Sequence, residues 1–260
     1  MNLSTTILVL KKTKLGETDL IITGFSEEGI QVRAVAKGAR RPGSRLGVHL
    51  ELFSIARVLI HQGRSLGIIT EAITVCSNEA CRSDVLHSAG ASVVVELLDH
   101  VSSDGDREVR LFPLASEALR CLGEVPEEGV ALITAAAALK LVSQLGFRPS
   151  LDHCVSCGHS IDPTSLSDES RAFSAFSFEQ GGILCEECLP MLEDCNHSTI
   201  DPQVIEWAKV LLMERFRDLE RYADAEHEAL GRELLGFIRE WVRFHLVKRL
   251  KSLDFLLGFG

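Results

Sequence analysis

Four cysteines carry the clearest chemical pattern in this sequence. Cys154 and Cys157 form one Cys-x-x-Cys pair, Cys185 and Cys188 form a second pair, and 27 residues separate the two pairs. Each pair makes a tight turn that points two sulfurs at one place, and four thiolates match the tetrahedral coordination of Zn²⁺. The spacing therefore predicts a structural zinc site, because four cysteine ligands leave no open position for a substrate or an activated water.

Two alternatives to zinc remain open for these cysteines. They could be reduced structural thiols without a metal, or the reactive thiols of a redox or hydrolytic enzyme, which would have to be exposed and low in pKa. The rest of the sequence offers no support for an enzyme. It contains no Gly-x-x-x-x-Gly-Lys phosphate loop, no His-Glu-x-x-His zinc motif and no Gly-x-Ser-x-Gly elbow. We therefore expect a protein without catalytic activity.

A basic segment is the second pattern that could do chemistry. It runs from Arg33 to Arg45 and holds five cations and no acid in 13 residues. It begins on a predicted strand and continues into a loop rich in Gly and Pro, and such a loop can follow a phosphate backbone without reading bases. The simpler alternative is a solvated charged loop. The candidate DNA-binding residues are Arg33, Lys37, Arg40, Arg41 and Arg45.

A third group of cations lies near the C-terminus, interleaved with apolar residues. These cations suit the negative end of a helix that packs on the core. They could also form, with an apolar groove, a dock for an acidic peptide that ends in Phe. The candidate partner-binding residues are Arg239, Arg243, Lys248, Arg249 and Lys251.

Charge and secondary-structure pattern divide the chain into two predicted domains, residues 1–80 and residues 81–260. The first has 10 basic and 7 acidic residues, and the second has 17 basic and 30 acidic residues. The first contains short segments rich in β-branched residues, which predict a small closed barrel or a sandwich. These segments are Thr5–Leu10, Leu20–Phe25, Gly29–Val35, Phe53–Ile60 and Leu66–Thr70.

The second predicted domain has helical periodicity, interrupted by the cysteine knuckle at residues 151–195. The segment Gly129–Leu145 is apolar on nearly all sides, so it should be the buried central helix. The fold class is therefore α+β, with a small N-terminal β-barrel followed by an all-α domain that carries an inserted four-cysteine zinc knuckle. The predicted helices are Val85–Val101, Glu108–Leu122, Gly129–Leu145, one that opens at Asp201-Pro202, and Gly231 to about Lys251.

Composition limits the classes of protein further. The chain has 260 residues, 46% hydrophobic and 25% charged, with a formal net charge of −10. This is globular composition, and it excludes a uniformly basic nucleic-acid binder. No apolar run approaches the roughly 20 residues of a membrane span, and the N-terminus does not resemble a secretory signal. We expect a cytoplasmic protein.

The motifs resemble those of the bacterial RecO family of recombination and repair mediators. The resemblance covers nearly the whole chain in the family's order. It rests on Leu15-Gly-Glu-Thr-Asp-Leu, Ala36-Lys-Gly-Ala-Arg-Arg-Pro-Gly-Ser-Arg, Leu145-Gly-Phe-Arg-Pro-Ser-Leu-Asp-His-Cys-Val-Ser-Cys-Gly, Phe173-Ser, Gly181-Gly-Ile-Leu-Cys and Leu250-Lys-Ser.

The resemblance implies an oligonucleotide/oligosaccharide-binding (OB) barrel followed by a helical domain with a zinc knuckle. It also implies binding to single- and double-stranded DNA, annealing of complementary strands, and location at the bacterial nucleoid. Its implied partners are RecR and the acidic C-terminal tail of single-stranded DNA-binding protein, which together help to load the RecA recombinase. The competing hypothesis is a zinc-ribbon scaffold that binds only proteins.

The first 80 residues contain only two aromatic residues, Phe25 and Phe53. Proteins that bind single strands usually stack bases on aromatic side chains. We therefore expect backbone electrostatics to dominate any DNA binding, with steep salt dependence and little sequence preference.

Overall fold

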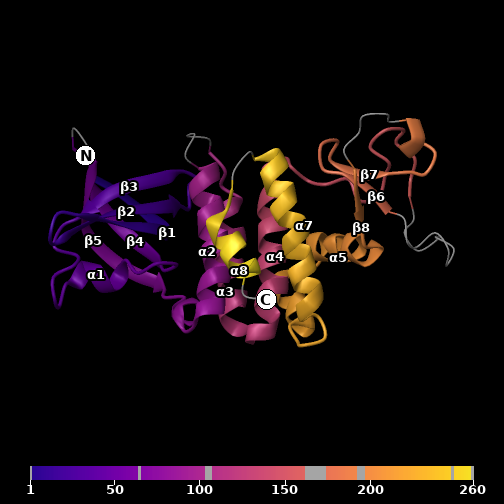
Figure 1. Ribbon diagram of the computed structural model, residues 1–260. Coiled ribbons are helices and arrows are strands. Elements are labelled where there is room, and N and C mark those ends of the chain that lie inside the picture. The colour runs from indigo at the N-terminus through magenta and orange to yellow at the C-terminus, as the bar shows by residue number, and fades with distance from the viewer. Residues whose placement is uncertain are drawn as a thin grey trace.

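The computed structural model describes residues 2–63, 66–102, 107–161, 174–191, 197–246 and 249–258. A β-barrel, a helical bundle and a small three-stranded sheet follow one another along the molecule (Figure 1). The barrel lies at one end and the small sheet at the other, with the bundle between them.

The N-terminal strands close into one barrel in the order β1-β2-β3-β5-β4, which decides between the barrel and the sandwich. β3 and β5 pair in parallel, and the other neighbours are antiparallel. The alternation predicted for the basic strand is present, since Ala34 and Ala36 are buried and Arg33 and Lys37 are exposed. The elements are β1 (Asn2–Leu15), β2 (Asp19–Ser26), β3 (Gln31–Ala36), α1 (Arg45–His49), β4 (Ile55–His61) and β5 (Gly67–Cys76).

The helical bundle is built around α4, which is buried from Gly129 to Val142 except at Lys140, as its sequence predicts. Its principal helices are α2 (Val85–Val101), α3 (Leu111–Glu124), α4 (Glu127–Gln144), α5 (Pro202–Met213), α7 (Glu228–His245) and α8 (Lys251–Leu257). The short turns are η1 (Glu79–Arg82), α6 (Phe216–Leu219) and η4 (Glu220–Tyr222). The N-cap predicted for α5 is confirmed, because the Asp201 side chain accepts a hydrogen bond from Gln203 N and Pro202 occupies the first turn.

The single helix predicted from Gly231 to about Lys251 is wrong at its C-terminal end. α7 ends at His245, and Leu250 has extended backbone before α8 begins. The break lets α8 turn back and pack against α2, burying Leu250, Leu253 and Leu256. Burial of these apolar side chains outweighs the local helical preference, which is a weak term.

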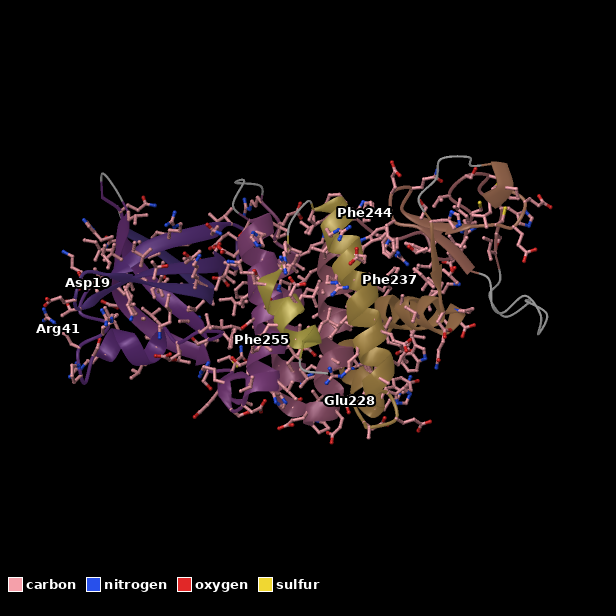
Figure 2. All side chains as sticks on the ribbon, viewed as in Figure 1. Asp19, Arg41, Glu228, Phe237, Phe244 and Phe255 are labelled. Carbon is pink, nitrogen blue, oxygen red and sulfur yellow. The ribbon has the colours of Figure 1, made fainter. Side chains whose placement is uncertain are left out.

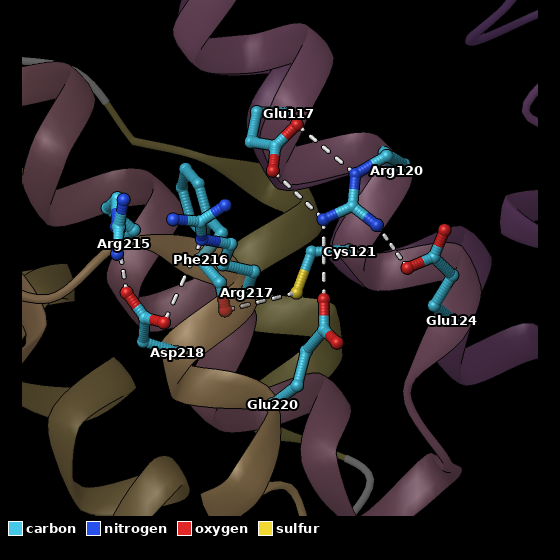
Figure 3. A network of polar contacts seen from close by, with 9 residues as sticks. All are labelled: Glu117, Arg120, Cys121, Glu124, Arg215, Phe216, Arg217, Asp218 and Glu220. Atoms are coloured by element: carbon cyan, nitrogen blue, oxygen red, sulfur yellow. Dashed lines mark hydrogen bonds and ion pairs between the residues drawn. The ribbon is translucent and has the colours of Figure 1, made fainter.

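An ionic network ties α3 to the turn after α6 (Figure 3). The Arg120 guanidinium bonds both carboxylate oxygens of Glu117, pairs with Glu124 one turn later, and reaches Glu220 at 3.3 Å. The neighbouring Arg215 pairs with Asp218 at 2.8 Å. The cations of this surface are therefore balanced by acids of the same surface.

The cysteine segment docks on α7 through aromatic rings. Its sheet has the order β7-β6-β8, with β6 at Ser174–Ser177, β7 at Gly182–Leu184 and β8 at Ser198–Ile200. The ring of Phe176 lies edge-on to Phe237, with centroids 5.1 Å apart, and 6.0 Å from Trp241. The Trp241 indole also donates a hydrogen bond to the Phe147 carbonyl at 2.9 Å. These contacts fix the small sheet against the bundle.

The barrel and the bundle share one hydrophobic core. Leu8, Phe25 and Phe53 of the barrel belong to the same buried cluster as α2, α3 and α4. At the rim of this contact, Gln31 Nε2 donates to Asp99 Oδ1 at 3.0 Å and to Ser102 Oγ at 3.2 Å. The barrel is therefore packed against α2 rather than tethered by a linker.

None of the helices within the described residues has both the length and the apolar character needed to cross a membrane.

Candidate DNA-binding surface and metal site

The basic loop lies at the end of the barrel farthest from the helical bundle. It joins β3 to α1 and passes through two left-handed glycines, Gly38 (φ 64°) and Gly43 (φ 72°). Figure 2 shows Asp19 and Arg41 side by side at this outer end. All five candidate cations are exposed: Arg33, Lys37, Arg40, Arg41 and Arg45.

The loop is held to the β1–β2 turn by hydrogen bonds. The Asp19 carboxylate accepts a bond from Gly38 N at 2.8 Å and another from the Thr18 hydroxyl at 3.0 Å. The Gly38 N–H, with help from Thr18 and the charges of Arg41 and Lys37, lowers the pKa of Asp19 below its usual value. The carboxylate is thus ionised at neutral pH and holds the start of the loop in place.

The two adjacent arginines of the loop have different roles in the structure. Arg40 Nη1 donates to the carbonyls of Glu17 at 2.8 Å and Gly16 at 3.3 Å, so its side chain braces the loop against the turn. Arg41 makes no side-chain hydrogen bond or ion pair with the described residues and is exposed at the tip. Arg41 is therefore the more available cation for an external anion.

The barrel offers no aromatic stacking platform. Phe25 and Phe53, the two aromatic residues of this part of the chain, are fully buried in the core. Because bases cannot stack on buried rings, the surface is suited to contact with phosphates rather than with bases.

The four cysteines come together, as their spacing predicts. Their sulfurs all lie within 4.8 Å of one another, and Cys157 Sγ is 3.8 Å from Cys185 Sγ. A Zn–S bond of about 2.3 Å in a tetrahedral site places sulfurs about 3.8 Å apart, so the cluster has the size of a metal site. Gly158 turns the first knuckle in the left-handed conformation (φ 72°), and its N–H bonds Cys154 O at 2.8 Å.

The sulfurs ionise unequally because they lie so close together. Cys154 is buried, which favours its neutral thiol, but N–H groups of Cys185, Cys157 and Ser156 point at it and lower its pKa to about 6. Ser156 lowers the pKa of Cys188, yet the neighbouring sulfurs of Cys185 and Cys157 outweigh it and raise that pKa to about 12. One thiolate forms readily, and a bound cation would stabilise the others.

The C-terminal cations are divided between two places. Arg239, Arg243 and Arg249 surround a cavity of about 300 Å³ between α7 and α8, with Leu250 and Leu253 among its apolar lining. Lys251 lies on the other side of α8 and lines a separate cavity against α2. Lys248 is outside the described residues.

Acids accompany the arginines of the first cavity. Arg239 and Arg243 lie 3.3 and 3.6 Å from the Glu240 carboxylate, and Arg249 pairs with Asp254 at 2.5 Å. The cavity thus combines cations with an apolar floor, but its cations already have intramolecular partners.

The basic loop and the cysteine cluster lie at opposite ends of the molecule (Figure 1). A metal held by the cysteines would therefore not touch a ligand bound at the loop. The geometry fits a structural role for that metal, as does a set of four cysteine ligands.

Two family descriptions match consecutive parts of the chain. "Recombination protein O N terminal" matches residues 1–77, which contain the barrel, and "Recombination protein O C terminal" matches residues 82–254. The fold and these matches define a class of proteins in which an N-terminal OB barrel precedes a helical domain. The chain belongs to the RecO family of DNA repair proteins.

Curated relatives carry the name "DNA repair protein RecO". A relative from Desulfitobacterium hafniense is 33% identical over 181 residues, which is 70% of this chain but only 62% of that protein. Relatives from Desulforamulus reducens and Caldanaerobacter subterraneus are 28% and 29% identical and are covered over 91% and 97% of their length. None of these names indicates a catalytic activity.

Sequence reasoning did not single out Lys11, which lies on the same outer face of the barrel as Arg33. The pairing of β1 with β2 and of β2 with β3 brings the two cations to one row. The register of these strands reveals that Lys11 and Arg33 are aligned, but strand register depends on pairing between segments distant in sequence.

Proposed function

We propose that this protein is a DNA repair and recombination mediator without enzymatic activity. It binds single- and double-stranded DNA, anneals complementary strands, and helps to load a recombinase on DNA coated with single-stranded DNA-binding protein. In this proposal residues 1–80 are the DNA-binding barrel, residues 81–260 are the helical domain with its knuckle at 151–195, and the protein acts at the bacterial nucleoid.

The observation that carries this proposal is the exposed cationic loop at the free end of an OB barrel. Lys37, Arg41 and Arg45 are exposed there, and the loop is held in shape by Asp19 and Arg40. A fixed row of cations neutralises phosphates and leaves base edges free to pair, which is what annealing of two strands requires. Arg33 and Arg40 belong to the same proposed surface.

The remaining 180 residues carry 13 more acidic than basic residues, so DNA should contact the barrel rather than the bulk of the helical domain. This distribution leaves the helical domain available for proteins. The cavity rimmed by Arg239, Arg243 and Arg249 supports docking of the acidic, Phe-ended tail of single-stranded DNA-binding protein, with its carboxylates on the arginines and its ring on Leu250 and Leu253. Lys248 and Lys251 remain candidates for this dock, and RecR is the second proposed partner.

The proposed cofactor is structural Zn²⁺, held by Cys154, Cys157, Cys185 and Cys188. It would bind the thiolates, tie the two knuckles together and thereby stabilise the small sheet that packs on α7.

Fluorescence anisotropy of a labelled single-stranded oligonucleotide over a salt series tests the DNA-binding proposal. Arg41→Glu should weaken binding about tenfold at moderate salt and reduce the salt dependence, because a phosphate contact becomes a repulsion. Arg57→Glu is the matched control: Arg57 is an exposed cation on β4 of the same barrel, away from the loop. The affinity of the Arg57→Glu protein for the oligonucleotide should stay near that of the wild type.

The same measurement distinguishes the mediator from the scaffold hypothesis. A protein-only zinc scaffold predicts no salt-sensitive DNA binding in the wild type, or equal affinities for the Arg41→Glu and Arg57→Glu proteins. Either result would remove the central support for the mediator.

A further inference from the structure

A polar cavity of about 290 Å³ opens where the outer face of the barrel meets the C-terminal end of α2. The residues that matter here are Lys11, Thr23 and Arg33 from β1, β2 and β3, Gln31 from the start of β3, and Asp99 and His100 from α2. The cavity is separate from the loop tip and from the arginine cavity between α7 and α8.

Strand register sets two cations on either side of a hydroxyl. Lys11 lies opposite Thr23, and Thr23 lies opposite Arg33. Neighbouring strands are about 4.8 Å apart, so the Cα atoms of Lys11 and Arg33 are about 10 Å apart. Two long side chains that start at this separation can both reach one anion above Thr23.

Neither of these cations is neutralised within the described part of the chain. The described ion pairs include neither Lys11 nor Arg33, and both residues are exposed. The adjacent Lys12 differs, because its Nζ pairs with Glu51 at 2.8 Å. A bulge in β1 between Val9 and Lys11 changes the pairing register just before these lysines.

Among the described residues that line the cavity, Asp99 contributes the carboxylate, and Gln31 binds it. Its Oδ1 accepts a hydrogen bond from Gln31 Nε2 at 3.0 Å, and the same amide nitrogen bonds the Asp99 carbonyl at 3.3 Å. The lining therefore keeps a surplus of positive charge from Lys11 and Arg33, reduced by Asp99.

We propose that this cavity binds one phosphate group of a DNA backbone. The Lys11 ammonium and the Arg33 guanidinium contact the phosphate oxygens, and the buried Thr23 between them forms part of the lining. This inference rests on the proposed DNA binding and extends it from the loop toward the helical domain. Lys37 follows the last residue of β3, so a DNA strand held at the loop can continue along β3 to the cavity.

Two substitutions with opposite expected effects test the inference by the same anisotropy measurement. Lys11→Ala should weaken oligonucleotide binding about three- to tenfold and lower the salt slope by about one phosphate contact. Asp99→Asn keeps the oxygen that accepts from Gln31 and removes a negative charge, so it should strengthen binding about two- to threefold. A gain of affinity cannot result from misfolding. Arg57→Ala is the control, because it removes one charge from β4 at a residue outside the cavity lining, and it should leave binding unchanged.

The outcomes separate failure of this inference from failure of the proposed function. If Arg41→Glu weakens binding while Lys11→Ala and Asp99→Asn match Arg57→Ala, the loop binds DNA and the cavity does not. If the wild type binds no DNA, both proposals fall together.

A titration with inorganic phosphate at constant ionic strength distinguishes the source of the anion. Under the inference, phosphate competes weakly with the oligonucleotide, and this competition is reduced by Lys11→Ala. If phosphate stabilises the protein through Lys11 while the oligonucleotide affinity is insensitive to Lys11→Ala, the cavity is a free-phosphate site and the inference is overturned.

Discussion

At the scale of single residues, the four cysteine sulfurs lie so close together that a bound cation would stabilise their thiolates. Four sulfurs within 4.8 Å cannot all ionise without mutual repulsion, and the neighbouring sulfurs of Cys185 and Cys157 raise the pKa of Cys188 accordingly. A metal ion removes this repulsion and turns the thiols into ligands.

Replacement of one ligand should abolish metal retention. We expect the wild type to hold about one zinc ion per chain and Cys154→Ser to lose it to a chelator, because three cysteines bind zinc far less tightly. Zinc quantification together with thiol titration of the native protein measures this. Cys76→Ser is the control, since Cys76 is exposed and outside the cluster. Four rapidly alkylated native thiols in the cluster, with no zinc, would instead support the reactive-cysteine alternative.

At the scale of elements, the contact between α4 and α7 depends on a glycine. A Cβ on Gly231 would lie 2.7 Å from Leu132 N and 3.1 Å from the Ala131 Cβ. These neighbours belong to the backbone and first side-chain atoms of the central helix, so they cannot turn aside as a flexible side chain could.

Two glycines of α7 should respond in opposite directions to the same substitution. Gly231→Ala should lower the free energy of unfolding by about 1–3 kcal/mol, because the added methyl group separates two packed helices. Gly236→Ala should raise it by up to about 1 kcal/mol, because its Cβ meets no atom within 4 Å and alanine favours the helix. Urea unfolding of both variants measures the difference, and equal effects would show that the helix contact is not tight at Gly231.

At the scale of the whole molecule, barrel and bundle should unfold as one unit. Leu8, Phe25 and Phe53 complete a core that continues into the helices, so the predicted boundary at residue 80 separates sequence patterns but not hydrophobic cores. Removing apolar surface from water is the main favourable term in folding, and here that surface is shared.

Thermal unfolding of Phe25→Ala tests this coupling. The substitution should lower the free energy of unfolding by about 3–5 kcal/mol, and the transitions recorded by two spectroscopic probes should shift together. Fluorescence of Trp207 and Trp241 reports only on the helical part, whereas far-UV circular dichroism also reports on the barrel. Ile73→Ala, at an exposed site on β5, should change neither signal. A barrel transition that precedes the tryptophan transition would contradict the shared core.

Local sequence patterns determined the cysteine cluster, the basic strand and the central helix. Two Cys-x-x-Cys pairs predict a four-sulfur cluster, alternation of Arg33 and Lys37 with Ala34 and Ala36 predicts a strand with a basic outer face, and the apolar segment at 129–145 predicts the central helix. These features follow from covalent spacing and from periods of two and 3.6 residues, which neighbours in the chain fix by themselves.

Tertiary structure decided what depends on partners distant in sequence. It closed the strands into a barrel and ended α7 at His245 so that α8 could pack on α2. It also distinguished Arg40, whose side chain bonds the carbonyls of a turn, from Arg41, for which the described residues show no such bond. It also aligned Lys11 with Arg33 through a strand register. Each outcome depends on burial or hydrogen bonding between segments that are distant in sequence, and local sequence patterns do not predict such contacts. These contacts outweigh the small intrinsic preferences of single residues.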